Sequence, residues 1–165
     1  MVDPQAMRAT LRYWASGVSV VTTAVGDRLA GMTVSAFNSL SLDPPMILVC
    51  LSKDSHTAQF VMDTKKFGVS FLGDHQAHLS DRFAGRIASI DHENRFTGVP
   101  IHTAVTGAPI LSEAVGWMDC EVSQAYDGAT HWIVTGRVLA AGQTQAEPSP
   151  LVYFDRHYRT LSTLE

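Results

Sequence analysis

Residues 18–37, VSVVTTAVGDRLAGMTVSAF, hold two runs of β-branched and alternating residues on either side of the dipeptide Gly26-Asp27. Such runs are typical of strands, and a glycine-containing dipeptide between two strands is typical of a hairpin turn. We therefore expect an antiparallel hairpin with strands over 18–25 and 29–37.

The rest of the chain adds further strand-length runs and three short helical patterns. Further strands are expected over residues 46–52, 67–73, 116–127, 131–142 and 151–154. Helices are expected over 4–16, 55–66 and 74–85, the last two with Ser55 and Asp74 as N-caps. Several glycines and prolines in residues 86–110 predict a long irregular connection.

The order of these segments predicts the fold class. Strands outnumber helices, and most links between strands are too short for the crossover that parallel strands need. We expect a mainly β protein, an antiparallel barrel with a few short peripheral helices. The length of 165 residues fits one domain over residues 1–165 with a core of its own.

The composition excludes several kinds of partner. The net charge is −4 and no Lys/Arg block occurs, which argues against nucleic acid. No apolar run approaches membrane-spanning length, and the N-terminus lacks a signal core, so we expect no membrane partner. Cys50 and Cys120 lie in separate apolar runs, which predicts buried, reduced thiols and a cytoplasmic location. The apolar content of 45% favours an oligomer.

Polar side chains gather just before the Pro44-Pro45 break. They are Thr33, Ser35, Asn38, Ser39 and Ser41. A strand packed on both faces would not carry them, because a buried polar group without a partner costs about 1–3 kcal/mol. Either this face is exposed and its Asn and Ser form a turn, or it borders a ligand with many polar atoms, such as a flavin ring.

A second polar band, SKDSHT (residues 52–57), follows the apolar run and opens a helix. One lysine, three hydroxyls and the free N–H groups of a helix terminus are suited to a phosphate group. The alternative is a helix cap with a solvated lysine. Two such bands on neighbouring strands favour a ligand more than either does alone.

The segment GMTVSAFNSLSLDPPMILVCLSKDSHT (residues 31–57) resembles the signature of the short-chain NAD(P)H:flavin oxidoreductases. These are the flavin reductase components of two-component flavin-dependent monooxygenases. The resemblance extends over roughly residues 7–158 and rests on several short motifs in the same order. They are FGVSFL, Gln76, RFAG (82–85), Gly107-x-Pro109-x-Leu111, Trp117-x-x-Cys120-x-Val122, His131-x-x-x-x-Gly136-x-Val138, and LVYF with Tyr158.

The resemblance implies a split β-barrel of the FMN-binding, Greek-key type, assembled as a homodimer with flavin near the dimer interface. It implies FMN or FAD as an exchangeable partner and NADH or NADPH as hydride donor. Reduced flavin would then pass to a separate monooxygenase.

The resemblance also assigns roles to individual residues. It places Met32, Thr33, Val34, Ser35 and Ala36 along the isoalloxazine ring and Asn38 and Ser39 beside the ribityl chain. The phosphate side would be formed by Ser52, Lys53, Ser55, His56 and Thr57, and a helix edge near the flavin by Arg82 and Phe83. On the nicotinamide side it places His131, as the catalytic residue, and Tyr158.

The sequence departs from the family pattern at Gly128-Ala129-Thr130-His131, where an acidic residue commonly precedes the histidine. The support of His131 by a neighbouring acid is therefore missing.

The residues leave other readings open. Hydride transfer needs no acid–base pair, since the cofactors carry the chemistry, and so the lack of an obvious pair does not exclude an enzyme. His75-x-x-His78 lacks a third ligand at useful spacing, and we expect no metal site. The alternatives are a flavoprotein oxidase of the pyridoxamine-phosphate-oxidase type and a non-catalytic flavin- or haem-binding barrel. The choices between FMN and FAD and between NADH and NADPH stay open.

Overall fold

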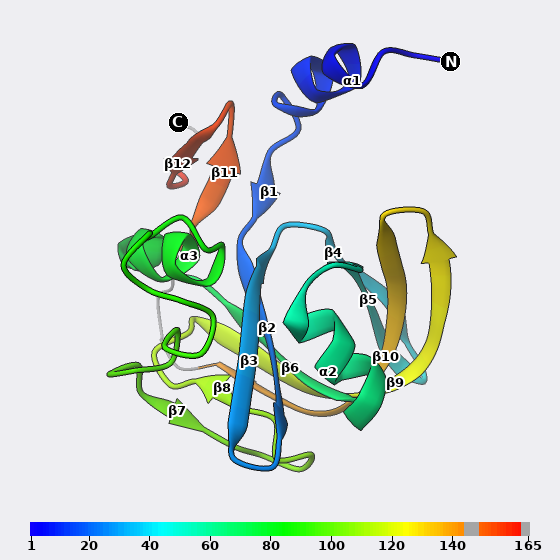
Figure 1. The fold of residues 1–165 in the computed structure, drawn as a ribbon, viewed down its shortest axis with the longest axis vertical. Coiled ribbons are helices and arrows are strands. Elements are labelled where there is room, and N and C mark those ends of the chain that lie inside the picture. Colours follow the sequence, from blue (N-terminus) through cyan, green and yellow to red (C-terminus); the bar gives the residue numbers. More distant parts are fainter. Residues whose placement is uncertain (144–148, 163–165) are drawn as a thin grey trace.

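The protein is described by a computed structural model that covers residues 1–143 and 149–162. Its centre is a seven-stranded sheet in the order β3-β2-β6-β9-β10-β5-β4, with every neighbouring pair antiparallel (Figure 1). The strands are β2 (Ser19–Val25), β3 (Arg28–Val34), β4 (Phe37–Leu42), β5 (Pro45–Ser52), β6 (Lys66–Phe71), β9 (Gly116–Gly128) and β10 (His131–Gln143). The predicted mainly β, antiparallel barrel is confirmed.

The barrel is split between β3 and β4. These two strands stand at opposite ends of the sheet order, yet only Ser35 and Ala36 separate them in the chain. The sheet therefore has to curl back on itself, and the Cys50 amide extends the β4–β5 pairing by a hydrogen bond to the Ala36 carbonyl (3.0 Å). This opening between two sheet edges carries the first polar band.

One strand prediction was wrong at this point. The expected strand over 29–37 ends at Val34, and Asn38, Ser39 and Ser41 belong to a further strand, β4, rather than to a turn. β4 is an edge strand with one partner, β5, and most of its residues are exposed. An edge strand needs little apolar content, so its polar sequence does not alternate as a core strand does.

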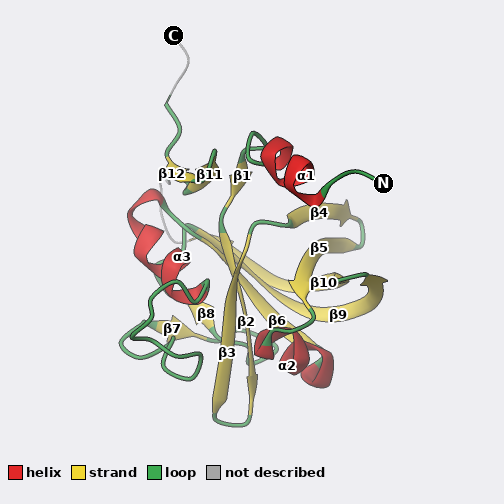
Figure 2. Cartoon of the chain, turned by 45° about the horizontal axis from the view of Figure 1, so that its top comes forward, coloured by secondary structure: helices red, strands yellow, loops and turns green. Residues whose placement is uncertain are grey.

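The core lies between the curled sheet and helix α2 (His56–Thr64), which packs on β2, β3 and β5 (Figure 2). Its fully buried members include Val21, Val49, Leu51, Val61 and Phe67. Alternate residues of β5 point into this core, as the burial of Ile47, Val49 and Leu51 shows. The strand predicted over residues 46–52 is thus confirmed as β5, between β10 and the edge strand β4.

The helices begin or end away from some expected residues. Ser55 caps α2 as predicted and accepts a hydrogen bond from the Ala58 amide (3.0 Å). Asp74 is not a cap, because residues Asp74–Gln76 form a 3-10 turn, η1, before helix α3 (Ala77–Phe83). The buried Gln76 side chain accepts from the Gly73 amide instead (2.9 Å).

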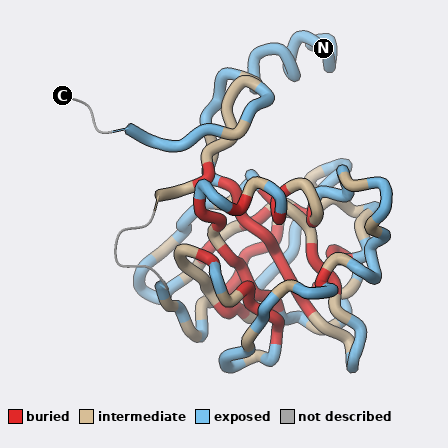
Figure 3. The backbone as a smooth tube through the Cα atoms, turned by 90° about the vertical axis from the view of Figure 1, so that its left-hand side faces the viewer, coloured by how far each residue is buried: buried red, intermediate tan, exposed pale blue. Residues whose placement is uncertain are grey.

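The N-terminal arm projects from the body of the protein (Figure 3). Helix α1 (Pro4–Leu11) is shorter than the predicted 4–16 and has no buried residue. Its apolar stripe is open, with Met7, Leu11 and Trp14 54%, 53% and 75% exposed. The arm joins the body through β1 (Ser16–Gly17), which pairs with β11 (Val152–Phe154), and β11 in turn pairs with β12 (His157–Arg159).

The long connection is largely irregular, as predicted, and contains a small hairpin of β7 (Ile101–His102) and β8 (Ile110–Leu111).

Both cysteines are free thiols. Cys120 is buried, and burial raises its pKa to about 12, whereas Cys50 is only half-buried, contrary to expectation. Within residues 1–143 and 149–162, no helix has the length and apolar content that a bilayer crossing requires.

Gly136 on β10 lies against the core, which explains the glycine in this motif. A β-carbon at Gly136 would lie 2.5 Å from Cζ of the fully buried Phe67 and 3.3 Å from Cβ of Cys120. We expect Gly136→Ala to lower the free energy of unfolding by about 1–3 kcal/mol, because the packed ring has little room to move. Thermal unfolding followed by circular dichroism measures this loss. The control is Gly17→Ala, where no atom lies within 4 Å of the new carbon; equal melting temperatures for the two variants would contradict the packing argument.

Candidate functional site at the barrel split

The second polar band contacts β3 at Met32, the residue directly before Thr33 of the first band. The Ser55 hydroxyl, in the second band, is 3.3 Å from the sulfur of Met32 on β3 and donates to the Ser52 carbonyl (2.8 Å). The same oxygen accepts from the Ala58 amide, so Ser55 fixes the first turn of α2 beside β3. The backbone N–H groups of His56 and Thr57, which precede these bonds, are the ones that the start of α2 can offer to an anion.

A cavity of about 1000 Å³ opens beyond the end of β3. Its wall contains Ser35, Ala36 and Asn38 from the split, with Phe71 and Trp14 as apolar surfaces. Ligand sites of this size combine a mostly apolar wall with a few polar groups. The cavity has the size and mixed lining that a tricyclic aromatic ring with several polar atoms requires.

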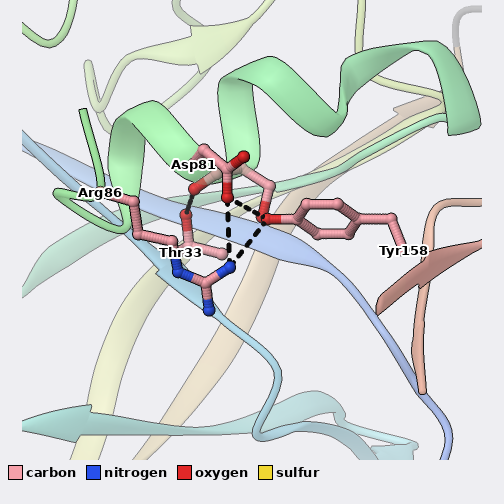
Figure 4. A network of polar contacts seen from close by, with 5 residues as sticks. Thr33, Asp81, Arg86 and Tyr158 are labelled. Atoms are coloured by element: carbon pink, nitrogen blue, oxygen red, sulfur yellow. Dashed lines mark hydrogen bonds and ion pairs between the residues drawn. The ribbon is translucent and has the colours of Figure 1, made fainter. Parts of the chain in front are cut away.

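Thr33 belongs to a polar network that ties β3 to α3 and to the C-terminal hairpin (Figure 4). Its hydroxyl donates to the Ser80 carbonyl (2.7 Å). The Tyr158 hydroxyl approaches Asp81 Oδ1 (2.6 Å) and Ser80 Oγ (3.0 Å), and Arg86 Nη1 donates to the same carboxylate oxygen (3.1 Å). Partial burial, followed by the contact with Asp81, raises the pKa of Tyr158.

Tyr158 was expected on the nicotinamide side, but in the structure its hydroxyl contacts residues of α3. The tyrosine holds the C-terminal hairpin against α3, and α3 in turn holds Thr33. Because the hydroxyl hydrogen of Thr33 is donated to Ser80, only the oxygen lone pairs of Thr33 remain for a ligand. The contact of Tyr158 with nicotinamide stays a prediction.

Lys53 is turned toward the β9–β10 hairpin. Its ammonium nitrogen is 2.8 Å from Asp127 Oδ1 and 4.6 Å from the ring centre of Trp132. The hydrogen bond from Lys53 lowers the pKa of Asp127. Lys53 therefore belongs to the expected phosphate segment, but its ammonium group forms an ion pair with Asp127.

His131, the first residue of β10, pairs with Ser52, the last residue of β5. Its Nδ1 is 2.9 Å from the hydroxyl of Thr130. A threonine therefore contacts the imidazole where an acidic neighbour is missing. The hydroxyl can donate or accept in this contact, and it carries no charge.

Several residues that were predicted to bind the flavin have buried side chains or side chains that bond to the protein backbone. The side chains of Val34, Thr57 and Phe83 are buried, with Phe83 fully covered and 5.0 Å from the ring centre of Phe96. Arg82 Nη2 donates to the carbonyls of Asn94 and Thr97. These side chains are therefore engaged in packing or in bonds to the backbone, whereas Ser39 and His56 are exposed.

Arg95 is a residue that the sequence analysis did not single out within the irregular connection predicted over residues 86–110. It is half-buried, and its Nη1 donates to the carbonyls of Gly31 (2.9 Å) and Phe83 (3.1 Å). The bond to Gly31 fastens the long loop to β3. No periodicity marks an arginine that bonds to backbone carbonyls, so the sequence held no signal for it.

Residues 11–162 match the family model described as "Flavin reductase like domain". The chain belongs to this family. Among its relatives is the reductase subunit HsaB of a flavin-dependent monooxygenase from Mycobacterium tuberculosis, 30% identical over 95% of this chain and 82% of that protein. The NADH-dependent flavin reductase StyB from Pseudomonas fluorescens is 32% identical over 95% of this chain and 89% of its own.

The fold comparison agrees with the sequence comparison. The crystal structure of a flavin reductase from Haemophilus somnus superposes with a TM-score of 0.91 and 29% identity, over 97% of this chain and 100% of that one. This flavin reductase-like chain therefore shares both the signature segment and the split-barrel architecture of its family.

Proposed function

We propose that this protein is an NAD(P)H:flavin oxidoreductase that reduces FMN or FAD and releases the reduced flavin to a separate monooxygenase. The observation that carries the proposal is a cavity of about 1000 Å³ lined by Ser35, Ala36 and Asn38, in a chain of the flavin reductase-like family whose second polar band contacts β3 through Ser55 and Met32. The names of StyB and HsaB support the hydride donor and the monooxygenase partner, respectively.

The residues at the split fit a flavin by the chemistry of their groups. Ser35, Ala36 and Asn38 offer backbone and side-chain polar atoms to the ring and the ribityl chain. Thr33, whose oxygen can only accept, suits the ring N–H of a flavin. The first turn of α2 offers N–H groups to the phosphate, with Ser52 beside it. Ser55 contributes by holding this turn in place.

A bound flavin supplies the hydride-accepting N5 atom. The protein's task is to hold the donor and acceptor rings in contact and to place hydrogen-bond donors where negative charge develops. Backbone amides around residues 33–39 are suited to this second task. We assign His131 to the nicotinamide side, where Thr130 orients its ring.

We further propose that the protein acts as a homodimer. The apolar stripe of α1 and the side chain of Leu42 on β4 (89% exposed) have no cover in the described chain. Exposed apolar surface on a projecting arm is typical of an interface. Because Leu11 and Trp14 also line the large cavity, a second copy that covers the arm would close this cavity.

The test of function is NADH and NADPH oxidation measured at increasing concentrations of FMN and FAD. We expect the rate to rise and saturate with added flavin, because flavin is a substrate that leaves after each turnover. A rate that ignores added flavin would support a flavoprotein oxidase instead. Flavin binding without any nucleotide oxidation would support a carrier.

A further inference from the structure

The phosphate segment, residues 52–57, is fastened to the turn between β9 and β10. The Lys53 amide donates to the Thr130 carbonyl (3.1 Å). The Lys53 ammonium group donates to Asp127 Oδ1 (2.8 Å). Both bonds join the residue that follows β5 to the end of the neighbouring hairpin. The segment that we assign to the flavin phosphate therefore contacts the hairpin through Lys53.

Asp127 is held on the hairpin independently of Lys53. Its Oδ1 also accepts from the Ala129 amide (2.8 Å), in the turn that joins the two strands. Ala129 has a positive φ of 64°, which costs an alanine some free energy, and the bond from its amide stabilises this conformation. Hydrogen bonds from Lys53 and Ala129 lower the pKa of Asp127, so the carboxylate is charged at neutral pH. The lysine thus has a charged partner that is itself fixed in place.

A second group on the hairpin also attracts Lys53. Its ammonium nitrogen lies 4.6 Å from the ring centre of Trp132, the residue that pairs with Asp127 across the hairpin. A cation over the face of an indole is attracted to the electrons of the ring. The Lys53 side chain is only 26% exposed as a result. The ion pair and the indole together direct the lysine toward the hairpin.

A lysine in this segment would otherwise be a ligand for phosphate. Lys53 lies two residues before Ser55, the N-cap of α2, and the free amides of His56 and Thr57 follow directly. A lysine ammonium on its flexible four-carbon stem binds phosphate as a point charge. The Asp127 carboxylate neutralises this charge and repels an anion nearby. It therefore weakens the attraction between Lys53 and the tail of a flavin.

We infer that Asp127 weakens flavin binding by holding Lys53 on the β9–β10 hairpin, and that it thereby favours release of the reduced flavin. This inference rests on the proposed function, in which flavin is a substrate that leaves after each turnover. Asp127 is a positioning residue, because it acts on the flavin phosphate through Lys53. Its effect should appear mainly in the dissociation rate, where most affinity differences between related complexes lie.

The test compares the binding of FMN and of riboflavin, which lacks the phosphate, in the wild-type protein and in Asp127→Asn. Asparagine keeps an oxygen acceptor for the Ala129 amide but has no charge to hold Lys53. We expect the dissociation constant of FMN to fall about fivefold and that of riboflavin to change less than about twofold, since one exposed charge pair with the phosphate is gained. Stopped-flow fluorescence should show the FMN dissociation rate falling by the same factor. Adding Lys53→Gln to Asp127→Asn should return FMN binding to the wild-type value.

The matched control is Glu121→Gln, which removes a carboxylate from the same hairpin. Glu121 Oε2 pairs with Arg137 Nη2 (3.0 Å), six residues before Asp127 along β9. This separation is roughly 20 Å along a strand, beyond the range of unscreened charge in physiological salt. FMN binding by this control should therefore equal that of the wild-type protein.

Three results would overturn the inference. FMN binding in Asp127→Asn could be unchanged or weaker, which would make the ion pair a clamp that the site needs or a contact without effect. Equal tightening of FMN and riboflavin would show that the phosphate is not involved, and equal tightening by Glu121→Gln would assign the effect to net charge. In each case saturable flavin reduction by the wild-type protein would leave the proposed function standing. A wild-type protein that binds no flavin would overturn both.

Discussion

A protein carrying Leu11→Arg together with Trp14→Ala is expected to be a folded monomer whose kcat/KM for flavin reduction is lower by about 100-fold, because loss of apolar surface from the cavity wall weakens flavin binding. Helix α1 has no buried residue, and Trp14 beyond it is 75% exposed. The substitutions therefore remove no contact from the core of the chain. They remove the apolar cover that we assign to the dimer and part of the wall of the large cavity.

Light scattering after size exclusion measures the association, circular dichroism the fold, and steady-state kinetics the activity. The matched control is Ala9→Arg, on the side of α1 away from the apolar stripe, which should remain a dimer with wild-type activity. The kinetic loss should appear mainly in the KM for flavin, because the cavity wall is opened while His131 is untouched. A double variant that stays dimeric, or a monomer with full activity, would show that the arm does not complete the site.

The sequence was most informative where burial and regular structure coincide. The hairpin around Gly26-Asp27, the apolar strand after Pro45 and the cap at Ser55 were all predicted, because each depends on contacts with near neighbours in the chain. The all-antiparallel arrangement followed from the short links between strands. These local signals were enough to predict the fold class.

Residues Phe37–Leu42 show why the barrel split could not be predicted. Their polar residues were explained either by an exposed face with a turn or by a face that borders a ligand, and a further strand was not predicted. They form β4, because one partner strand is sufficient for an edge strand. The position of β4, at the opposite end of the sheet order from β3, depends on the curl of the whole sheet. This curl is set by tertiary structure and has no local sequence pattern.

The candidate site was predicted in part for the same reason. The two polar bands were recognised as neighbours, and Met32 and Ser55 do lie in contact. The support of Thr33 by Ser80 and Tyr158, and the fastening of Gly31 by Arg95, involve segments 47 to 78 residues apart in the chain. Only the packing of α3 and the long connection on β3 brings these groups together.

Replacing Asp119 on β9 with alanine is expected to lower the free energy of unfolding by about 3–5 kcal/mol, since the carboxylate is buried and charge-assisted hydrogen bonds depend on it. Oδ2 accepts from the amides of Val105 and Thr106 (2.7 Å each), and Oδ1 accepts from the Thr106 hydroxyl. Alanine would leave these donors without a partner. Urea unfolding at neutral pH measures the loss, with the exposed Asp63→Ala as control.

The Asp119 contacts also determine where this loss should appear in the structure. The carboxylate holds residues 105–106 of the long connection on β9, and the Thr106 hydroxyl in turn accepts from the Ala108 amide (3.1 Å). Amide hydrogen exchange in Asp119→Ala should therefore accelerate first at Val105, Thr106 and Ala108, because local opening precedes global unfolding where an anchor is lost. Asp119→Asn keeps one acceptor oxygen for the amides and should lose less than half as much stability. If alanine and asparagine were equally tolerated, or if exchange rose uniformly through the sheet, the carboxylate would not be the anchor of this loop.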